Sequence, residues 1–391
     1  MDVPFWIWAI TIAAIVGMLV FDFVGHVRTP HAPSLKEAAT WSAVYVGIAV
    51  LFGLGVFWFG GATPGGEYFA GYITEKSLSV DNLFVFVLIM ASFGVPRIAQ
   101  QKVLLFGITF ALVLRTIFIL IGAAAIENYS WVFWIFGGIL IYTAVVQARS
   151  GGHNGDEEFK ENAVLRLVRR VVPTTEEHHG DKMTVKLQGK RYITPLAIAL
   201  IAIGSADIIF AVDSIPAIFG LTQDTYLVFA ANAFSLLGLR QLFFLIDGLL
   251  DRLVYLAYGL AVILTFIGAK LVIHAMHTNE LSWINGGEHI TVIPEIPTWL
   301  SLAVILVTLL VTTVTSLRHD RKVRERRQAR DAAAGTATPA TGTATPTTGI
   351  EGTDTRTATD DRTSHDADGT DDVDRISDDP DAERVGPAAG R

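Results

Sequence analysis

Four carboxylates interrupt two long apolar segments of the chain, at residues 67–92 and 193–219. In chain order they are Glu75, Asp81, Asp207 and Asp213. An ionised side chain at the centre of a membrane helix costs roughly 2.5 to 3.5 kcal/mol, so such residues normally face a cavity, a partner charge or a substrate. Four acids in two such segments therefore predict a functional site inside the membrane.

The side chains beside these acids also offer oxygen atoms. Hard oxygen donors suit Mg²⁺, Ca²⁺ or Mn²⁺, whereas zinc and copper sites usually recruit histidine or cysteine. The chain contains no cysteine. We predict that the metal ligands are Glu75, Asp81, Asn82, Asp207, Asp213 and Ser214, with Asp22 and Asn232 as accessory residues.

The spacing within each acidic pair limits how the acids can meet one ion. Two residues six positions apart on a straight helix lie about 120° and ~9 Å apart, so both cannot face the same ion. Either the helices are interrupted, which Gly71 and Pro216 would permit, or the acids serve different points along a path. Unwound turns would also supply carbonyl oxygens.

Three basic residues lie in the first of these segments or in the apolar segment that follows each of them: Lys76 in 67–92, Arg115 in 103–125 and Arg240 in 225–246. We interpret the two arginines as counter-charges for carboxylates that hold no cation. In the alternative interpretation, all three basic residues form structural ion pairs that stabilise helix packing. The protein would then be a non-transporting membrane scaffold or assembly factor.

Long apolar segments must position these residues, since 51% of the chain is hydrophobic. A helix of about 20 apolar residues crosses the hydrocarbon layer of a membrane. We therefore predict an all-α, polytopic transmembrane bundle of about nine helices. They are expected at residues 5–24, 41–60, 67–92, 103–125, 130–147, 193–219, 225–246, 253–276 and 298–317.

The distribution of Lys and Arg predicts the orientation. Four alternate loops, at residues 61–66, 126–129, 220–224 and 277–297, contain no Lys or Arg, whereas the opposite loops are basic. We expect a multi-pass protein of the cytoplasmic (inner) membrane, with its N-terminus outside and its C-terminus in the cytoplasm.

This pattern divides the chain into three parts. Residues 1–317 form the predicted transmembrane transporter domain, which includes a cytoplasmic loop at 148–192. Residues 318–330 form a basic juxtamembrane segment. Residues 331–391 are acidic and poor in large apolar side chains, so we predict a disordered cytoplasmic tail.

Two short segments, 75–82 and 207–214, have similar sequences. Each begins with an acid, and after five intervening residues comes Asp followed by a small polar residue. Each is also followed by an apolar segment that contains one arginine, Arg115 or Arg240. The intervening helix count predicts an inverted-topology repeat, around helices 2–4 and 5–7. Inverted repeats are typical of secondary transporters, which hold substrate near the bilayer midplane.

The segments 75–86 and 207–218 resemble the two most characteristic motifs of the TerC family of integral membrane proteins. Asp22 and the segments 238–240, 249–252 and 296–302 are also similar to that family, so the resemblance covers about residues 5–317. It implies a membrane protein linked to tellurium resistance and, in several members, to Mn²⁺ export. The acidic motif positions of the family correspond to Glu75, Asp81, Asp207 and Asp213, with Asn82 and Ser214 beside them.

These observations predict a secondary transporter that exports divalent cations, with Mn²⁺ the leading candidate. A tellurium oxyanion would meet four carboxylates, so any tellurium resistance is expected to be indirect. The membrane segments contain no nucleophile and base pair, phosphate loop or zinc motif, so we do not expect an enzyme. The expected partners are membrane lipid and a divalent metal ion, with no nucleic acid and no resident cofactor, and the oligomeric state stays open.

Overall fold

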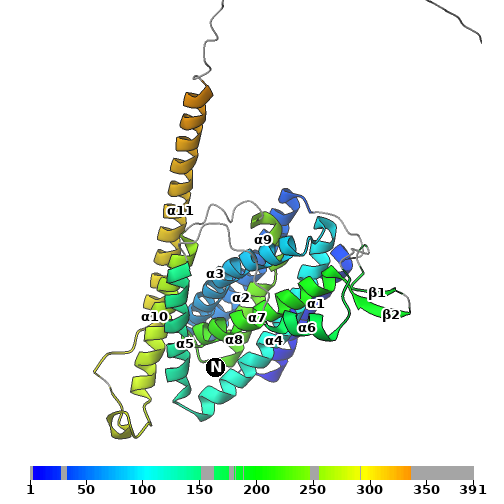
Figure 1. Ribbon diagram of the computed structural model, residues 1–391. Coiled ribbons are helices and arrows are strands. Elements are labelled where there is room, and N and C mark those ends of the chain that lie inside the picture. Colours follow the sequence, from blue (N-terminus) through cyan, green and yellow to red (C-terminus); the bar gives the residue numbers. More distant parts are fainter. Residues whose placement is uncertain are drawn as a thin grey trace, which may run out of the picture. The chain divides into compact units, whose positions relative to one another are not determined.

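The chain folds into a bundle of long helices (Figure 1). The computed structural model describes residues 3–27, 33–150, 163–175, 180, 182–187, 189–246, 255–290 and 292–335. The helices are α1 (Phe5–Asp22), α2 (Leu35–Gly60), α3 (Ala62–Ser92), α4 (Arg97–Asn128), α5 (Val132–Ser150), α6 (Ala163–Val171), α7 (Pro195–Phe219), α8 (Thr225–Leu236), α9 (Leu239–Ile246), α10 (Leu256–His277) and α11 (Thr298–Gly335).

Eight segments in the described part of the chain are helical, long enough and apolar enough to cross a membrane. They correspond to eight of the nine predicted spans, and the ninth lies in α3. With 31 residues α3 is long enough to span a bilayer, but it carries Glu67, Glu75, Lys76 and Asp81, so it is more polar than the others. The predicted all-α class is confirmed, and the inverted repeat stays a prediction.

Two helices beside α3, namely α7 and α8, belong to the most buried spans. In the most apolar stretch of α7, 67% of the residues are buried, and in that of the span formed by α8 and α9, 89% are buried. The same share is only 17% in α1 and in α2. α3 packs against α2, α7 and α8, while α4 packs against α7, and α10 packs against α5 and α11 (Figure 1). The charged side chains of α3 therefore lie in the interior of the bundle.

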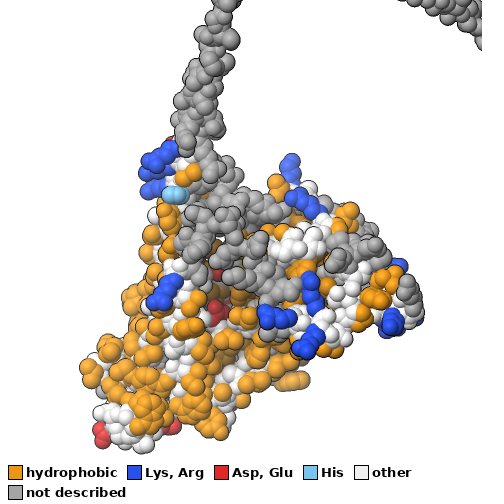
Figure 2. Space-filling view, viewed as in Figure 1, with side chains coloured by type: hydrophobic (Ala, Val, Ile, Leu, Met, Phe, Trp, Pro, Cys, Tyr) orange, Lys and Arg blue, Asp and Glu red, His pale blue; other side chains and the backbone are white. Residues whose placement is uncertain are grey.

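The outer surface is broadly hydrophobic, as Figure 2 shows. Large apolar side chains are exposed on the peripheral helices, including Leu51 and Trp58 of α2, Ile121 of α4 and Leu310 of α11. So large an apolar surface would be unfavourable in water and suits contact with lipid.

Neither Gly71 nor Pro216 interrupts its helix, although the sequence suggested breaks at these residues. α3 and α7 are continuous through both residues. A Cβ atom on Gly71 would lie 3.2 Å from the Cβ atom of Ala231, so this glycine serves close packing of α3 on α8. Pro216 lies in the last turn of α7, and the helix continues through it to Phe219. Because both helices are continuous, the two acids of each pair cannot face the same ion. The remaining alternative is that the acids serve different points along a path.

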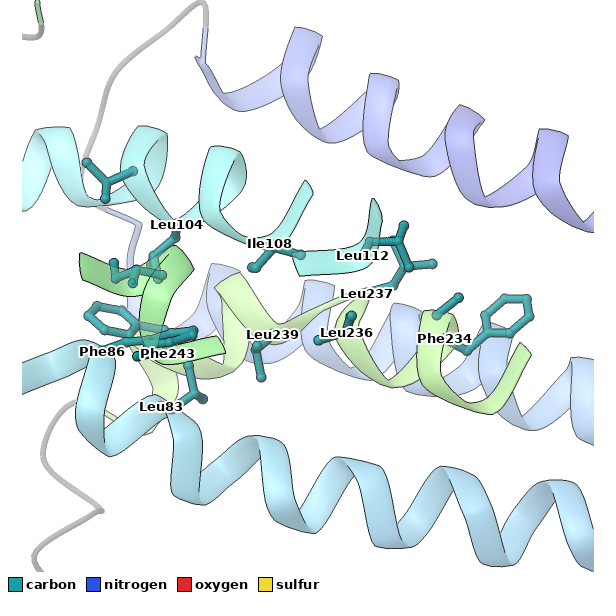
Figure 3. Close-up of a cluster of buried hydrophobic side chains, with 14 of the residues drawn as sticks. Leu83, Phe86, Leu104, Ile108, Leu112, Phe234, Leu236, Leu237, Leu239 and Phe243 are labelled. Carbon is teal, nitrogen blue, oxygen red and sulfur yellow. The ribbon is translucent and has the colours of Figure 1, made fainter. Parts of the chain in front are cut away.

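The predicted segment 225–246 is instead broken between α8 and α9. Leu237 is extended, with φ −62° and ψ 133°, and Gly238 has φ +80°. Figure 3 shows Leu236, Leu237 and Leu239 at this junction, within the cluster of buried apolar side chains that α3 and α4 also supply. The break is thus enclosed by the core.

Gly238 is required by this break, so replacing it with alanine is expected to destabilise the protein by about 1 to 3 kcal/mol. Its φ is unfavourable for residues with a side chain, and an added Cβ atom would approach the Cβ atom of Tyr45 to 2.9 Å. Thermal unfolding in detergent measures the effect. Gly55→Ala is the matched control, because this α2 glycine has open space around it. Equal stability of both variants would show that the break tolerates a side chain.

The segment after α5 contains the only strands in the described residues. β1 (Thr184–Leu187) and β2 (Lys190–Ile193) form an antiparallel hairpin after the short helix α6. At the other end of the chain, α11 continues through Gly335, so the basic segment 318–330 extends the last span as helix. Residues 336–391, which hold most of the predicted acidic tail, lie outside the described residues.

Candidate functional site

Arg115 joins two of the four acids in the centre of the bundle. From α4, its Nη1 donates a hydrogen bond to Oε1 of Glu75 in α3. Its Nη2 donates to Oδ1 of Asp207 in α7 at 2.9 Å, and its Nε donates to Oδ2 at 3.4 Å. The side chains of Arg115 and Glu75 are fully buried and that of Asp207 is 3% exposed. One planar guanidinium thus holds α3 and α7 together.

Asp81 and Asp213 extend this arrangement. Oδ2 of Asp81 accepts a hydrogen bond of 2.8 Å from Nε2 of Gln147 in α5. Asp213 interacts electrostatically with both Arg115 and Asp81. The four acids on which the sequence analysis centred therefore belong to one charge network, which spans α3, α4, α5 and α7.

Lys76 lies next to Glu75 in sequence and contacts another part of the core. Its Nζ donates to the carbonyl oxygens of Ser235, at 3.0 Å, and Leu237, at 3.4 Å. These carbonyls belong to the break between α8 and α9. Lys76 is counted with the network because it adjoins Glu75 on α3. With Arg115 it sets two positive charges against the four carboxylates, which leaves a formal charge of −2. A bound divalent cation would balance that charge.

Arg240 pairs with Asp22 rather than with any of the four acids. Its Nη2 lies 3.0 Å from Oδ1 of Asp22, and its Nη1 donates to Oε1 of Gln101 at 3.2 Å. Gln241 donates to the same Asp22 oxygen at 3.4 Å. The break at Gly238 separates α8 from α9, and Arg240 follows it on α9, packed between α1 and α4. Arg240 is thus paired with the accessory residue Asp22, and its role as a counter-charge for empty metal ligands stays a prediction.

Several buried polar atoms near the network lack a hydrogen-bond partner. Asn82, Ser214 and Asn232 are all buried, as predicted ligands should be. The unpartnered atoms of the described core on α3, α7 and α8 are Thr74 Oγ1, Glu75 Oε2, Ser79 Oγ, Ser214 Oγ, Asn232 Nδ2 and Ser235 Oγ. Buried polar atoms are nearly always paired, so each such atom calls for an explanation. All but the amide nitrogen are oxygen atoms able to face a cation.

The predicted ligands do not converge on one point in this conformation. Among the described residues, no three His, Asp or Glu side chains come close enough together to hold a metal ion. Glu75 and Asp207 are bound to Arg115, and Asp81 is bound to Gln147. The donors have the right chemistry for a hard divalent cation, but binding would require Arg115 to release its carboxylates.

A polar cavity of about 580 Å³ lies at one end of α3. Glu67 lines it and accepts a hydrogen bond of 2.7 Å from Thr222. Across the cavity, His274 lies 2.9 Å from Glu295, and Lys270 interacts with both glutamates. Glu67 precedes Glu75 by eight residues, or about 12 Å along the helix, so this cavity lies two turns from the charge network.

Three parts of the site were missed by the sequence analysis. Glu67 was within a predicted span, and its acidic type was a usable signal. Gln147 ends the predicted segment 130–147, but one glutamine at a helix end carries little information. The carbonyl oxygens of Ser235 and Leu237 had no signal in residue type, because every residue has a carbonyl.

Known proteins resemble this chain over most of its length. The model of the family described as "Integral membrane protein TerC family" matches residues 61–324. An uncharacterized membrane protein of Mycobacterium tuberculosis is 53% identical over 333 residues, which cover 85% of this chain and 84% of that protein. One of Myxococcus xanthus is 42% identical over 68% of this chain and 83% of its own length.

An Escherichia coli protein, named "Putative membrane-bound redox modulator Alx", is 36% identical over 75% of this chain and 90% of its own length. No solved structure matches the chain. The family match includes both acidic helices, α3 and α7, and the helix that carries Arg115. With its buried ion pairs and membrane-length helices, the protein belongs to the TerC family of integral membrane proteins.

Proposed function

We propose that this protein is a secondary transporter that exports a divalent metal cation, first of all Mn²⁺, across the cytoplasmic membrane. The observation that carries the proposal is the buried charge network with its formal charge of −2. Uncompensated charge in a membrane interior is costly and marks substrate pathways. Oxygen ligands without thiolates favour a hard ion over zinc or copper.

The geometry supports a cycle in which Arg115 and the cation exchange places. Without cargo, the guanidinium pairs with both Glu75 and Asp207. A cation that reaches Asp81 and Asp213 attracts the carboxylates and repels the guanidinium. Because Arg115 comes from α4 while the acids come from α3 and α7, releasing it frees these helices to shift relative to one another, as alternating access requires.

The pathway follows α3. The polar cavity at Glu67 leads by about two helical turns to Glu75 and by about four to Asp81. All three acids lie on one continuous helix, so cargo would pass from one carboxylate to the next. The cavity serves as the proposed outer opening.

Charge separation on the surface supports the proposed orientation. Figure 2 shows Lys and Arg near the hairpin and toward the C-terminal half of α11. Asp and Glu appear at the opposite end and also midway along the molecule. The loop between α10 and α11 has three glutamates and no Lys or Arg. Basic residues concentrate on the cytoplasmic side of membrane proteins. This favours a cytoplasmic C-terminal end of α11 and an outer position for the cavity.

Transport by the purified protein in liposomes tests the proposal. Vesicles loaded with a metal-sensing dye receive Mn²⁺, Ca²⁺, Mg²⁺ or Zn²⁺ in turn, and protein-free vesicles report leakage. We expect Mn²⁺ flux that depends on the protein and is larger than Zn²⁺ flux. If none of the four ions crosses faster than in protein-free vesicles, the transporter proposal fails.

A second candidate, the non-transporting scaffold or assembly factor, is favoured by one observation. The network is closed by ion pairs in this conformation, and no three-residue metal group forms in the described part of the chain. A scaffold predicts no metal binding to the purified protein and loss of function when residues 318–391 are removed. Unaltered cellular function after that truncation would disfavour the scaffold.

A further inference from the structure

The break between α8 and α9 presents carbonyl oxygens inside the core to groups outside the helix. The last carbonyls of a helix have no partner within the helix, and this end also carries partial negative charge. Here the oxygens of Ser235 and Leu237 both accept from Nζ of Lys76. A positive charge therefore already occupies the end of α8.

Two unpartnered hydroxyl oxygens belong to residues that contact Lys76 or neighbour it in sequence. Ser235 Oγ belongs to the same residue as one of the two carbonyls, and Ser79 Oγ lies one turn after Lys76 on α3. Both residues are fully buried, and both hydroxyls lack a partner. Because α3 packs against α8, the hydroxyls and carbonyls come from facing helices.

We propose that the α8–α9 break is a binding site for a monovalent alkali cation, of the Na⁺ class, in which the Lys76 ammonium is the tethered occupant in this conformation. Carbonyls freed at the end of a broken membrane helix are suited to Na⁺. The ammonium and a sodium ion would compete for the same two oxygens. The inference goes beyond metal export and does not depend on it.

Charge favours a monovalent ion over a divalent one at this position. The two groups that contact Lys76 are neutral carbonyls, and the neighbouring hydroxyls are neutral as well. One alkali ion at these oxygens carries the same charge as the ammonium that occupies them. Ca²⁺ and Mg²⁺ sites normally include carboxylates, and the groups that contact Lys76 include none.

The simpler interpretation is that Lys76 only caps the end of α8. An ion titration of a Lys76→Ala variant distinguishes such a cap from an alkali-cation site. Its purified form is unfolded thermally in detergent with NaCl, LiCl, KCl or choline chloride at constant ionic strength. We expect the Tm of the wild type to be independent of the cation. The Tm of the variant should fall in choline and rise again with Na⁺, following the logarithm of concentration above the dissociation constant.

Lys36→Ala is the control, because it removes an exposed lysine at the start of α2, away from the break. It should show no dependence on Na⁺. If Lys76→Ala responds alike to Na⁺ and choline, or no more than Lys36→Ala, the site is only a cap and the proposal is overturned.

A second variant covers the case in which Lys76→Ala does not fold. Lys76→Gln keeps an N–H donor for the carbonyls and removes the charge. Binding of ²²Na⁺ to this variant, absent from the wild type and lost on adding Ser235→Ala, would support the proposal, and no binding would overturn it. Neither measurement involves Mn²⁺, so failure of the transport assay would leave both results interpretable.

Discussion

Replacing Arg115 with methionine should destabilise the folded protein by about 3 to 5 kcal/mol, the cost of breaking a buried ion pair from one side. The change leaves Glu75 and Asp207 buried side by side without their shared cation. Methionine keeps much of the length and apolar volume of the stem, so loss of packing is small. Thermal or denaturant unfolding in detergent measures the effect.

The triple variant Glu75→Gln, Arg115→Met, Asp207→Asn provides the matched control. It removes all three charges together, and replacing a complete buried ion pair by neutral groups is often tolerated. We expect most of the lost stability to return while metal transport stays absent. A single Arg115→Met variant as stable as the wild type would mean that the guanidinium does not compensate these carboxylates.

Asp81→Asn and Asp213→Asn should each abolish metal export. The carboxamide keeps the shape of the carboxylate, and in the Asp81→Asn variant its oxygen could still accept the hydrogen bond from Gln147, so we expect the fold to persist. The network would lose one of its two uncompensated negative charges, which removes the attraction for a divalent ion. Cells with either variant should accumulate as much Mn as cells without the protein.

Glu127→Gln is the control for these variants, because Glu127 is an exposed acid at the end of α4. It should leave export unchanged. Protein levels in the membrane fraction must match among all three variants. Normal export by both aspartate variants would remove the central support for the carrier, and loss in only one would assign the cation to that acid.

The sequence was sufficient for the features that depend on local composition. A run of about 20 apolar residues has few alternatives to a membrane helix, so the predicted spans agree with the observed helices to within a few residues at most of their ends. Charged residues inside such runs are costly. This is why Glu75, Arg115 and Asp207 could be assigned to an interior network before their contacts were known.

Other features depend on three-dimensional packing and were not predictable. The break at Leu237 and Gly238 occurs within an apolar run whose composition resembles that of the continuous helices. Arg240 and Arg115 occupy similar positions in sequence, yet the break leaves Arg240 beside Asp22. Pairing of Asp81 with Gln147 depends on how α5 packs, which the spacing of residues along one helix does not encode.

The formal charge of −2 on the buried network has an electrical consequence. A network loaded with one divalent ion is neutral, so its outward step would be insensitive to membrane voltage. The empty network would return two negative charges toward a negative interior, at a cost of up to about 2.3 kcal/mol for each charge at 100 mV. Turnover would therefore slow as the vesicle interior is made more negative, unless small cations accompany the return and cancel the current.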